Sequence, residues 1–324
     1  MATSEFDIIR RYFSRVGKKQ NWLSVGIGDD AAVITPDPDS QLLISVDTLN
    51  AGVHFPEHSS ASDVGYKALA VNLSDIAAMG GEPKWFTLAL SLPSADEDWL
   101  TAFCQGLSVL VEQYQLCLVG GDTTRGSLSI TIQIAGVIPQ HQALSREGAM
   151  LNDDVYVSGQ LGDAAVGLMI CQQALKVNEQ AVPIFMDRLN RPQPRVELGM
   201  ALRQLANACI DISDGLAADL GHILEASGVG AEIYPDRIPV SAEFAKLELD
   251  AQKKQDCMLY GGDDYELCFT AAPDKRDTIL DLAARVGINV TRIGQIINED
   301  GLFAVEKDQR GMLPEKGYDH FQNK

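Results

Sequence analysis

Basic residues are scarce in this sequence. Its 324 residues include 26 Lys and Arg against 45 Asp and Glu, which gives a formal net charge of -19. Nucleic-acid backbones and anionic membrane surfaces are bound through clustered basic residues, so this charge argues against both as partners. No apolar stretch approaches the ~20 residues of a membrane span, and no basic segment followed by an apolar one marks a signal peptide. We therefore expect a cytoplasmic protein that handles small molecules.

Several catalytic and metal-binding signatures are also missing. The sequence has no GxxxxGK[ST] segment, which excludes a P-loop, and no GxSxG segment of the kind that carries a serine nucleophile. Its 6 cysteines form no CxxC pair, so we expect free thiols and neither disulfides nor a zinc site. His54 and His58 have the spacing of a helical zinc pair, but Pro56 between them prevents a regular helix.

Aspartates in apolar, glycine-rich surroundings are the feature that the sequence does have. An unpaired buried carboxylate is costly, so such residues are normally paired with a base or bound to a metal. Nearby lysines and arginines are too few to pair them all. Hard divalent cations such as Mg²⁺ are then the natural partners, and Mg²⁺ usually binds together with phosphates. The residues concerned are Asp29, Asp30, Asp47, Asp75, Asp122, Asp211, Asp214, Asp263 and Asp264.

Two of these aspartates follow or interrupt strongly apolar segments. Asp47 comes at the end of a predicted strand over residues 42–46, where α/β sheets present their site residues; a helix or turn cap is the alternative. Asp75 lies on a predicted helix over residues 62–79 whose other residues near it are aliphatic. Helix interiors disfavour aspartate, so an acid on this helix needs a partner; a solvent-exposed residue is the alternative.

Glycines and hydroxyl groups accompany other aspartates. Asp122 follows a predicted strand over residues 116–119 and a flexible glycine pair. Such a pair lets the backbone approach a phosphate; a tight hairpin turn is the alternative. Asp211 and Asp214 flank a serine at or just before a predicted helix over residues 214–226. One of the two could be a helix cap, but two acids in this setting favour a metal.

The segment Gly26–Ala31 matches GxGxxA, a weak dinucleotide-binding fingerprint. A Rossmann turn presents bare backbone amides to a pyrophosphate, and the two adjacent carboxylates of this segment would repel that group. A turn that binds metal explains the same glycines and uses the acids.

A change of character near residues 139–150 divides the chain. Both halves mix predicted helices and strands, and in both an apolar strand leads to an aspartate. A Gly-Gly-Asp segment occurs in each half, at Gly120 and at Gly261, which hints at related halves. The sequence therefore predicts an α/β (α+β) fold in two domains, residues 1–140 and residues 150–324.

Taken in order, six motifs of the chain resemble those of the thiamine-monophosphate kinase family. Single motifs also occur across the superfamily that includes aminoimidazole ribonucleotide synthetase and selenophosphate synthetase, but the ordered set is far more specific. The likeness extends from Glu5 to the closing segment 317–321. The motifs are GIGDDA (26–31), SVDTL (45–49), KALAVNLSDIAAMG (67–80), GGDTT (120–124), DISDGL (211–216) and GGDDYEL (261–267).

This resemblance implies a two-domain fold like that of aminoimidazole ribonucleotide synthetase. The N-terminal domain would bind metal and ATP and would dimerise, its sheet forming a barrel in a homodimer. The C-terminal α/β domain would complete the ATP and substrate site, with ATP and several Mg²⁺ ions between the domains.

The resemblance also assigns site residues. The implied metal ligands are Asp30, Ser45, Asp47, Asp75, Asp122, Asp211 and Asp214, with backbone atoms of Val46. The implied ATP contacts are Gly121, Asp122, Arg146 and Ser213. The implied substrate contacts are His54, Asp263 and Tyr318. The family commonly has glutamate where this chain has Asp263, so the acid has a shorter reach towards the thiamine cation.

The implied reaction transfers the γ-phosphoryl group of ATP to the phosphate of thiamine monophosphate and releases ADP, the last step of thiamine diphosphate biosynthesis. A phosphate monoester has a second pKa near ~6, so the attacking oxygen is largely ionised at neutral pH and no catalytic general base is expected. A related ATP-dependent synthetase of the same superfamily and a non-catalytic nucleotide or metal sensor are the alternatives.

Overall fold

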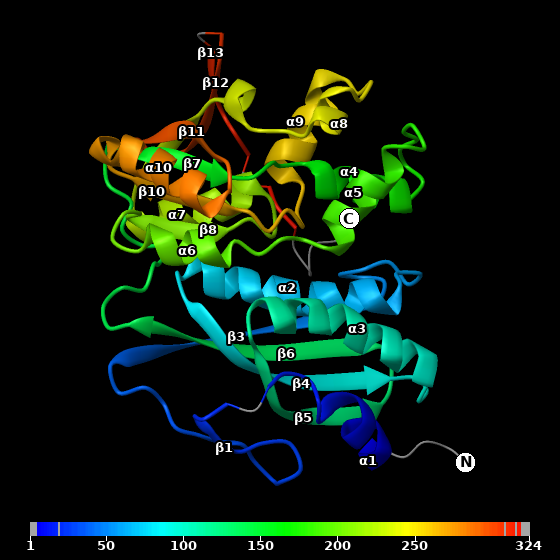
Figure 1. Cartoon of the computed structure of the whole chain (residues 1–324). Helices are drawn as coiled ribbons and strands as arrows, with labels where there is room; N and C mark the ends of the chain where they lie inside the picture. The colour runs from blue at the N-terminus through cyan, green and yellow to red at the C-terminus, as the bar shows by residue number, and fades with distance from the viewer. Residues whose placement is uncertain (1–4, 19, 308, 315, 319–324) are drawn as a thin grey trace. The chain divides into compact units, whose positions relative to one another are not determined.

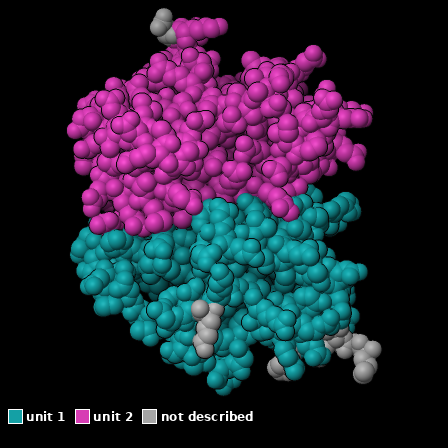
Figure 2. Space-filling model, in the orientation of Figure 1, with its two compact units in different colours: residues 1–76, 81–141 teal, residues 77–80, 142–324 magenta. Residues whose placement is uncertain are grey.

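A computed structural model describes residues 5–18, 20–307, 309–314 and 316–318 of the chain. The chain divides into two compact units, residues 1–76 with 81–141 and residues 77–80 with 142–324 (Figure 2). Each unit contains both helices and strands, which confirms the mixed α/β fold class predicted from the sequence. None of the helices in the described part of the chain is long and apolar enough to cross a membrane.

The first unit is built on a four-stranded sheet with the strand order β3-β6-β4-β5 (Figure 1). A separate two-stranded sheet of β1 and β2 precedes it along the chain. The strands are β1 (Leu23–Val25), β2 (Val33–Ile34), β3 (Ser40–Asn50), β4 (Glu82–Leu92), β5 (Cys117–Arg125) and β6 (Ser129–Pro139). The helices are α1 (Glu5–Ile8), a π-helical turn (Ile9–Phe13), α2 (Ala61–Ala78) and α3 (Glu97–Gln113).

The side chains of this sheet alternate between a buried and an open face. On β6, Ile130, Ile132 and Ile134 are fully buried, and the residues between them are half-exposed. On β3 the apolar side chains of Leu42, Ile44 and Val46 are instead exposed by 49%, 58% and 59%. Since successive residues of a strand point to opposite faces, β3 directs an apolar row to the open side of the sheet, and β3 is one of its two edge strands.

Strand β5 differs from its sequence-based prediction. It does not end at the glycine pair but continues to Arg125 and pairs in parallel with β4. The glycine pair lies inside a strand, so the alternative of a tight hairpin turn is wrong at this position. A Cβ atom on Gly121 would lie 1.9 Å from the carbonyl oxygen of Leu88, so glycine is needed there because β5 approaches β4 so closely.

The second unit is built on a seven-stranded sheet with the order β13-β12-β9-β11-β7-β10-β8. Its strands are β7 (Asp154–Ser158), β8 (Ala208–Asp211), β9 (Gly230–Ile233), β10 (Leu267–Ala271), β11 (Val290–Ile297), β12 (Gly301–Glu306) and β13 (Gln309–Met312). Its helices are α4 (Asp163–Cys171), α5 (Val182–Asn190), α6 (Val196–Leu202), α7 (Leu216–Ser227), α8 (Ala242–Ala245), α9 (Ala251–Tyr260) and α10 (Arg276–Val286). Two 3₁₀ turns cover Pro235–Arg237 and Pro273–Lys275.

Helix α7 forms the centre of the main core of this unit. Its Leu216, Leu220 and Ile223 are fully buried in one cluster with apolar residues of β7, β8, β9, β10 and β11. Every residue of β7, β8 and β10 is buried, as expected for strands covered on both faces. Strand β8 and helix α7 therefore hold the short connection between them, residues 212–215, on a rigid support.

Candidate functional site

Strand β3 and helix α2 bring three of the predicted metal-binding residues together in the first unit. Ser45 and Asp47 are two positions apart on β3 and so point to the same face of the strand. The Ser45 hydroxyl donates a short hydrogen bond to Oδ2 of Asp75 on α2, and the Asp47 carboxyl also hydrogen-bonds with Asp75. Both alternatives from the sequence, a cap for Asp47 and a solvent-exposed Asp75, fail because the two carboxyls face each other.

Burial and mutual repulsion perturb this carboxyl pair. The pKa of Asp47 is raised from 3.8 to about 7. Removal from water is the largest cause, and the negative charge of Asp75 and a hydrogen bond with Asp75 are the next two. Two carboxyl groups that share a site without a cation hold a proton in this way. Two carboxylates and a hydroxyl are also hard oxygen donors of the kind that Mg²⁺ prefers. The chemistry of the donors therefore fits a divalent cation.

The other predicted ligands of the first unit lie elsewhere on it. Asp30 is exposed between β1 and β2, and Asp122 is exposed on β5, where its Oδ1 accepts from the N–H of Thr123. Asp47 and Gly121 occupy one row of the sheet, but β6 and β4 separate them, so they lie about 14 Å apart at the usual strand spacing. Across the described residues, no group of three or more His, Cys, Asp or Glu side chains is placed to hold a metal.

His54 follows β3 in a half-buried loop. Its Nδ1 accepts a hydrogen bond of 3.0 Å from the backbone N–H of Asn50. An imidazole nitrogen that accepts carries no hydrogen, so the hydrogen of the neutral ring is on Nε2.

In the second unit, the connection between β8 and α7 carries three predicted site residues. Asp211 is the last residue of β8, and Ser213 and Asp214 precede the helix. The helix cap is Gly215, which makes no side-chain capping bond. Oδ2 of Asp219, in the first turn of α7, accepts the N–H groups of residues 213, 214 and 215 at 3.0, 3.0 and 3.1 Å. The alternative that Asp211 or Asp214 caps the helix is therefore wrong.

Asp219 was missed at the sequence level. It interrupts an apolar helix in the segment Leu-Ala-Ala-Asp-Leu, which is the same signal that identified Asp75. Burial, followed by the charges of Asp211 and Asp214, raises the pKa of Asp219 to about 8, although its bonds to backbone N–H groups oppose the change. Three acids thus lie close together here, and this part of the unit favours cations.

Backbone hydrogen bonds join this connection to two other predicted site residues. The N–H of Asp263 donates to the carbonyl of Ser213 at 2.9 Å, and the N–H of Tyr318 donates to the carbonyl of Asp214 at 3.4 Å. A Cβ atom on Gly262 would lie 2.4 Å from the Ser213 carbonyl oxygen, so the close approach requires glycine. The second unit therefore brings predicted metal, ATP and substrate residues together in one place.

Asp263 has an unusual backbone conformation. Its φ of +69° lies in the left-handed region, which aspartate and asparagine tolerate better than most other residues. The bend directs the chain from the Gly-Gly pair into β10. Aspartate is therefore compatible with the backbone conformation at this position.

Arg146, a predicted ATP contact, lies at the other end of α7. Its carbonyl accepts from the hydroxyl of Ser227 at 3.3 Å, and Ser227 is the last residue of the helix. A helix of 12 residues is about 18 Å long, so the backbone of Arg146 is far from Ser213. The structure does not bring these two predicted ATP contacts together.

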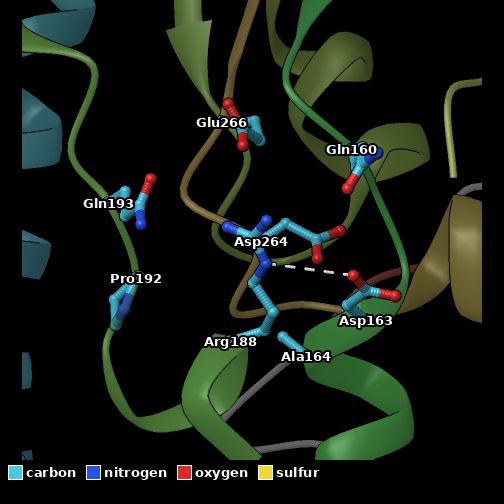
Figure 3. Close-up of a pocket in the computed structure, with 8 residues that line it drawn as sticks. All are labelled: Gln160, Asp163, Ala164, Arg188, Pro192, Gln193, Asp264 and Glu266. Atoms are coloured by element: carbon cyan, nitrogen blue, oxygen red, sulfur yellow. Dashed lines mark ion pairs between the residues drawn. The ribbon is translucent and has the colours of Figure 1, made fainter. Parts of the chain in front are cut away.

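A small cavity in the second unit is lined by further acids (Figure 3). Its volume of about 10 Å³ accommodates about one water molecule. Asp163 faces Arg188 across it at 3.9 Å, and Glu266 pairs with Arg195. Asp264 accepts from the N–H of Gly162 at 3.0 and 3.1 Å, and burial raises its pKa well above the ordinary value. These acids tie the cavity walls together, and the cavity is too small for a nucleotide.

Two family models match the chain. The model described as AIR synthase related protein, N-terminal domain, matches residues 28–138, and the model described as AIR synthase related protein, C-terminal domain, matches residues 152–307. The two-domain fold expected from the sequence is thereby confirmed.

Similar proteins match along the whole chain. The thiamine-monophosphate kinase of Salmonella typhimurium strain LT2 is 47% identical over 324 residues, with 99% of each chain covered. A crystal structure of thiamine-monophosphate kinase from Stenotrophomonas maltophilia K279a has a TM-score of 0.86 and 48% identity, and the match covers 94% of this chain and 97% of that one. A structure of AaThiL complexed with AMPPCP and TMP has a TM-score of 0.78 and 32% identity, with coverage of 97% and 94%.

Proposed function

Because this chain belongs to the thiamine-monophosphate kinase family, we propose that it transfers the γ-phosphoryl group of ATP to the phosphate of thiamine monophosphate, giving thiamine diphosphate and ADP. The observation that carries the proposal is identity of 47% along the full length of a named kinase. The complex of AaThiL with AMPPCP and TMP supports an ATP-like nucleotide and thiamine monophosphate as the two substrates.

The proposed nucleophile is an oxygen of the thiamine phosphate. This oxygen is largely ionised at neutral pH because the second pKa of a phosphate monoester is ~6. The chain then needs to orient two polyanions for in-line attack and to reduce their repulsion, and it needs no general base. Positioning and electrostatic stabilisation account for most of the catalysis in such transfers.

Mg²⁺ is the cation proposed for both acidic clusters. When bound, it would neutralise part of the negative charge of the phosphates. In the first unit, Ser45, Asp47 and Asp75 would hold it, as their contacts and the raised pKa of Asp47 support. In the second unit, Asp211 and Asp214 would do so. Asp30, Asp122 and the backbone of Val46 are proposed as further ligands.

The substrate contacts are proposed from the family resemblance. Gly121, Asp122 and Ser213 would contact ATP, Ser213 through its hydroxyl, since its N–H is bonded to Asp219. Arg146 stays a prediction as a phosphate contact. His54 would donate from Nε2 to the thiamine phosphate side, and the acid of Asp263 would pair with the thiamine cation beside Tyr318.

The open face of the first unit supports a homodimer. Leu42, Ile44 and Val46 form an exposed apolar row on edge strand β3, and such rows on a protein surface mark interfaces. We propose that the N-terminal sheets of two copies pair through this row to form a barrel. Ile44→Asp should convert the dimer into monomers in sedimentation experiments, whereas the exposed control Leu280→Asp should not; a monomeric wild-type protein would contradict the proposal. The cytoplasmic location stays a prediction.

The function is tested with purified protein, ATP, Mg²⁺ and a panel of phosphorylated acceptors. We expect ADP release with thiamine monophosphate and little with the other acceptors. ADP release with a different acceptor would indicate a related synthetase. ATP binding without ADP release from any acceptor would indicate a sensor.

A further inference from the structure

Asp219 is a buried acid that the proposed reaction does not yet use. Its side chain is 2% exposed, and one carboxylate oxygen accepts three successive backbone N–H groups, those of residues 213, 214 and 215. These hydrogen bonds restrain three successive peptide groups at once. This side chain therefore holds residues 213–215 of the connection between β8 and α7.

The three N–H groups would otherwise form a binding site for an anion. Successive amides at a helix N-terminus make a nest that takes phosphate in many nucleotide-binding proteins. In this protein the nest is filled by the chain's own carboxylate. The connection therefore presents side-chain oxygens, and not amides, to a ligand, which suits a cation.

The fixed peptide groups also determine where the neighbouring segment lies. With its N–H groups directed at Asp219, the connection offers the carbonyls of Ile212 and Ser213 to the N–H groups of Tyr265 and Asp263, at 2.8 and 2.9 Å. Asp219 thus fixes Asp214 directly and Asp263 through Ser213. A change at position 219 would reach both groups without touching a ligand.

We propose that Asp219 is a positioning residue that holds residues 211–215 in the geometry in which Asp211 and Asp214 bind Mg²⁺. The inference rests on the proposed metal-dependent function. Residues that orient metal ligands from behind typically contribute 10–100-fold to metal affinity or activity. Asp219→Ala removes all three hydrogen bonds and should weaken metal binding by about 100-fold, while Asp219→Asn keeps one neutral acceptor and should weaken it by about tenfold.

Asp153→Ala is a matched control. Asp153 is also 2% exposed, and its Oδ2 also accepts a backbone N–H, that of Met150, and the side-chain amide of Asn207, both at 2.9 Å. Asp153 bonds to Asn207, which precedes β8, whereas Asp219 bonds to residues that follow β8. The control variant thus loses a similar buried acid whose contact lies at the opposite end of β8.

The test measures Mn²⁺ binding by the full-length protein with AMPPCP, from the electron paramagnetic resonance signal of free Mn²⁺, together with the Mg²⁺ dependence of the kinase rate. We expect both Asp219 variants to bind Mn²⁺ more weakly and to need more Mg²⁺, with partial rescue in Asp219→Asn and a near-normal rate at saturating Mg²⁺. The control should bind Mn²⁺ like the wild type, whatever stability it loses.

Unchanged Mn²⁺ affinity in both Asp219 variants, or an equal loss in Asp153→Ala, would overturn the inference. Should Asp219→Ala fail to fold, Asp219→Asn alone decides the comparison. A wild type that binds Mn²⁺ but forms no thiamine diphosphate would refute the proposed function and leave the positioning role to be judged from the Mn²⁺ data.

Discussion

The carboxyl pair of Asp47 and Asp75 should make the metal-free protein less stable than it would be without one of the acids. In the folded protein the pKa of Asp47 is raised from 3.8 to about 7, so folding disfavours the ionised carboxylate. At 1.36 kcal/mol for each tenfold change in acidity, the complete effect is about 4 kcal/mol, and partial screening by solvent brings it to about 2–4 kcal/mol. Asp47→Asn removes the charge and should therefore raise the free energy of unfolding.

The pH dependence of this gain has a definite sign. Well below pH 3.8 the Asp47 carboxyl is protonated in both folded and unfolded chains, so the substitution changes little. Between 3.8 and about 7 the unfolded chain ionises first, and the wild type loses stability as the pH rises. Above about 7 the gain in the variant is complete.

The assay is thermal unfolding of the wild type and Asp47→Asn in EDTA, at about pH 8 and about pH 4, with exposed Asp39→Asn as the control. We expect Asp47→Asn to unfold about 5–10 °C higher than the wild type at the higher pH, with little difference at the lower pH. Added Mg²⁺ should stabilise the wild type more than the variant, and the variant should form no thiamine diphosphate. A variant no more stable than the wild type at about pH 8, or equally stabilised at both pH values, would refute this account of the pair.

Three further substitutions test other parts of the structure. Asp263→Asn keeps a residue that tolerates the left-handed backbone, so the free energy of unfolding should change by less than about 0.5 kcal/mol. In steady-state kinetics, KM for thiamine monophosphate should rise about tenfold because about 1.4 kcal/mol of charge pairing is lost. An unchanged KM would remove Asp263 from the substrate site. Glu266→Gln leaves the largely buried guanidinium of Arg195 without its counter-ion and should cost about 3–5 kcal/mol in urea unfolding. A loss below about 1 kcal/mol would show that the pair is solvated. Gly121→Ala forces a Cβ against the backbone of β4 and should destabilise the first unit by about 3 kcal/mol or more in the same experiment, whereas wild-type stability would mean that the two strands can separate easily.

Regular elements with clear periodicity could be predicted from the sequence. The helices predicted over residues 62–79 and 214–226 are present as α2 (Ala61–Ala78) and α7 (Leu216–Ser227), with ends that differ by two residues or fewer. Strand β5 could not, because a glycine pair is read locally as a flexible segment. The close contact with Leu88 that makes glycine necessary is a property of strand pairing, and a sequence window does not contain it.

The candidate site shows the same division. Apolar surroundings identified Asp47 and Asp75 as acids in need of a partner, and the structure places them against each other. Asp219 carries the same signal but was not singled out, although the three amides that it accepts belong to the residues just before its own helix. The position of Arg146 beside the last residue of α7, in contrast, depends on tertiary structure.

Direct transfer between two phosphates is tested most directly with ATP that is labelled in its γ-phosphate. Incubated with the purified protein, Mg²⁺ and thiamine monophosphate, the label should appear in the terminal phosphate of thiamine diphosphate in an amount equal to the ADP formed. Label released as inorganic phosphate, or ADP formed without labelled thiamine diphosphate, would contradict it.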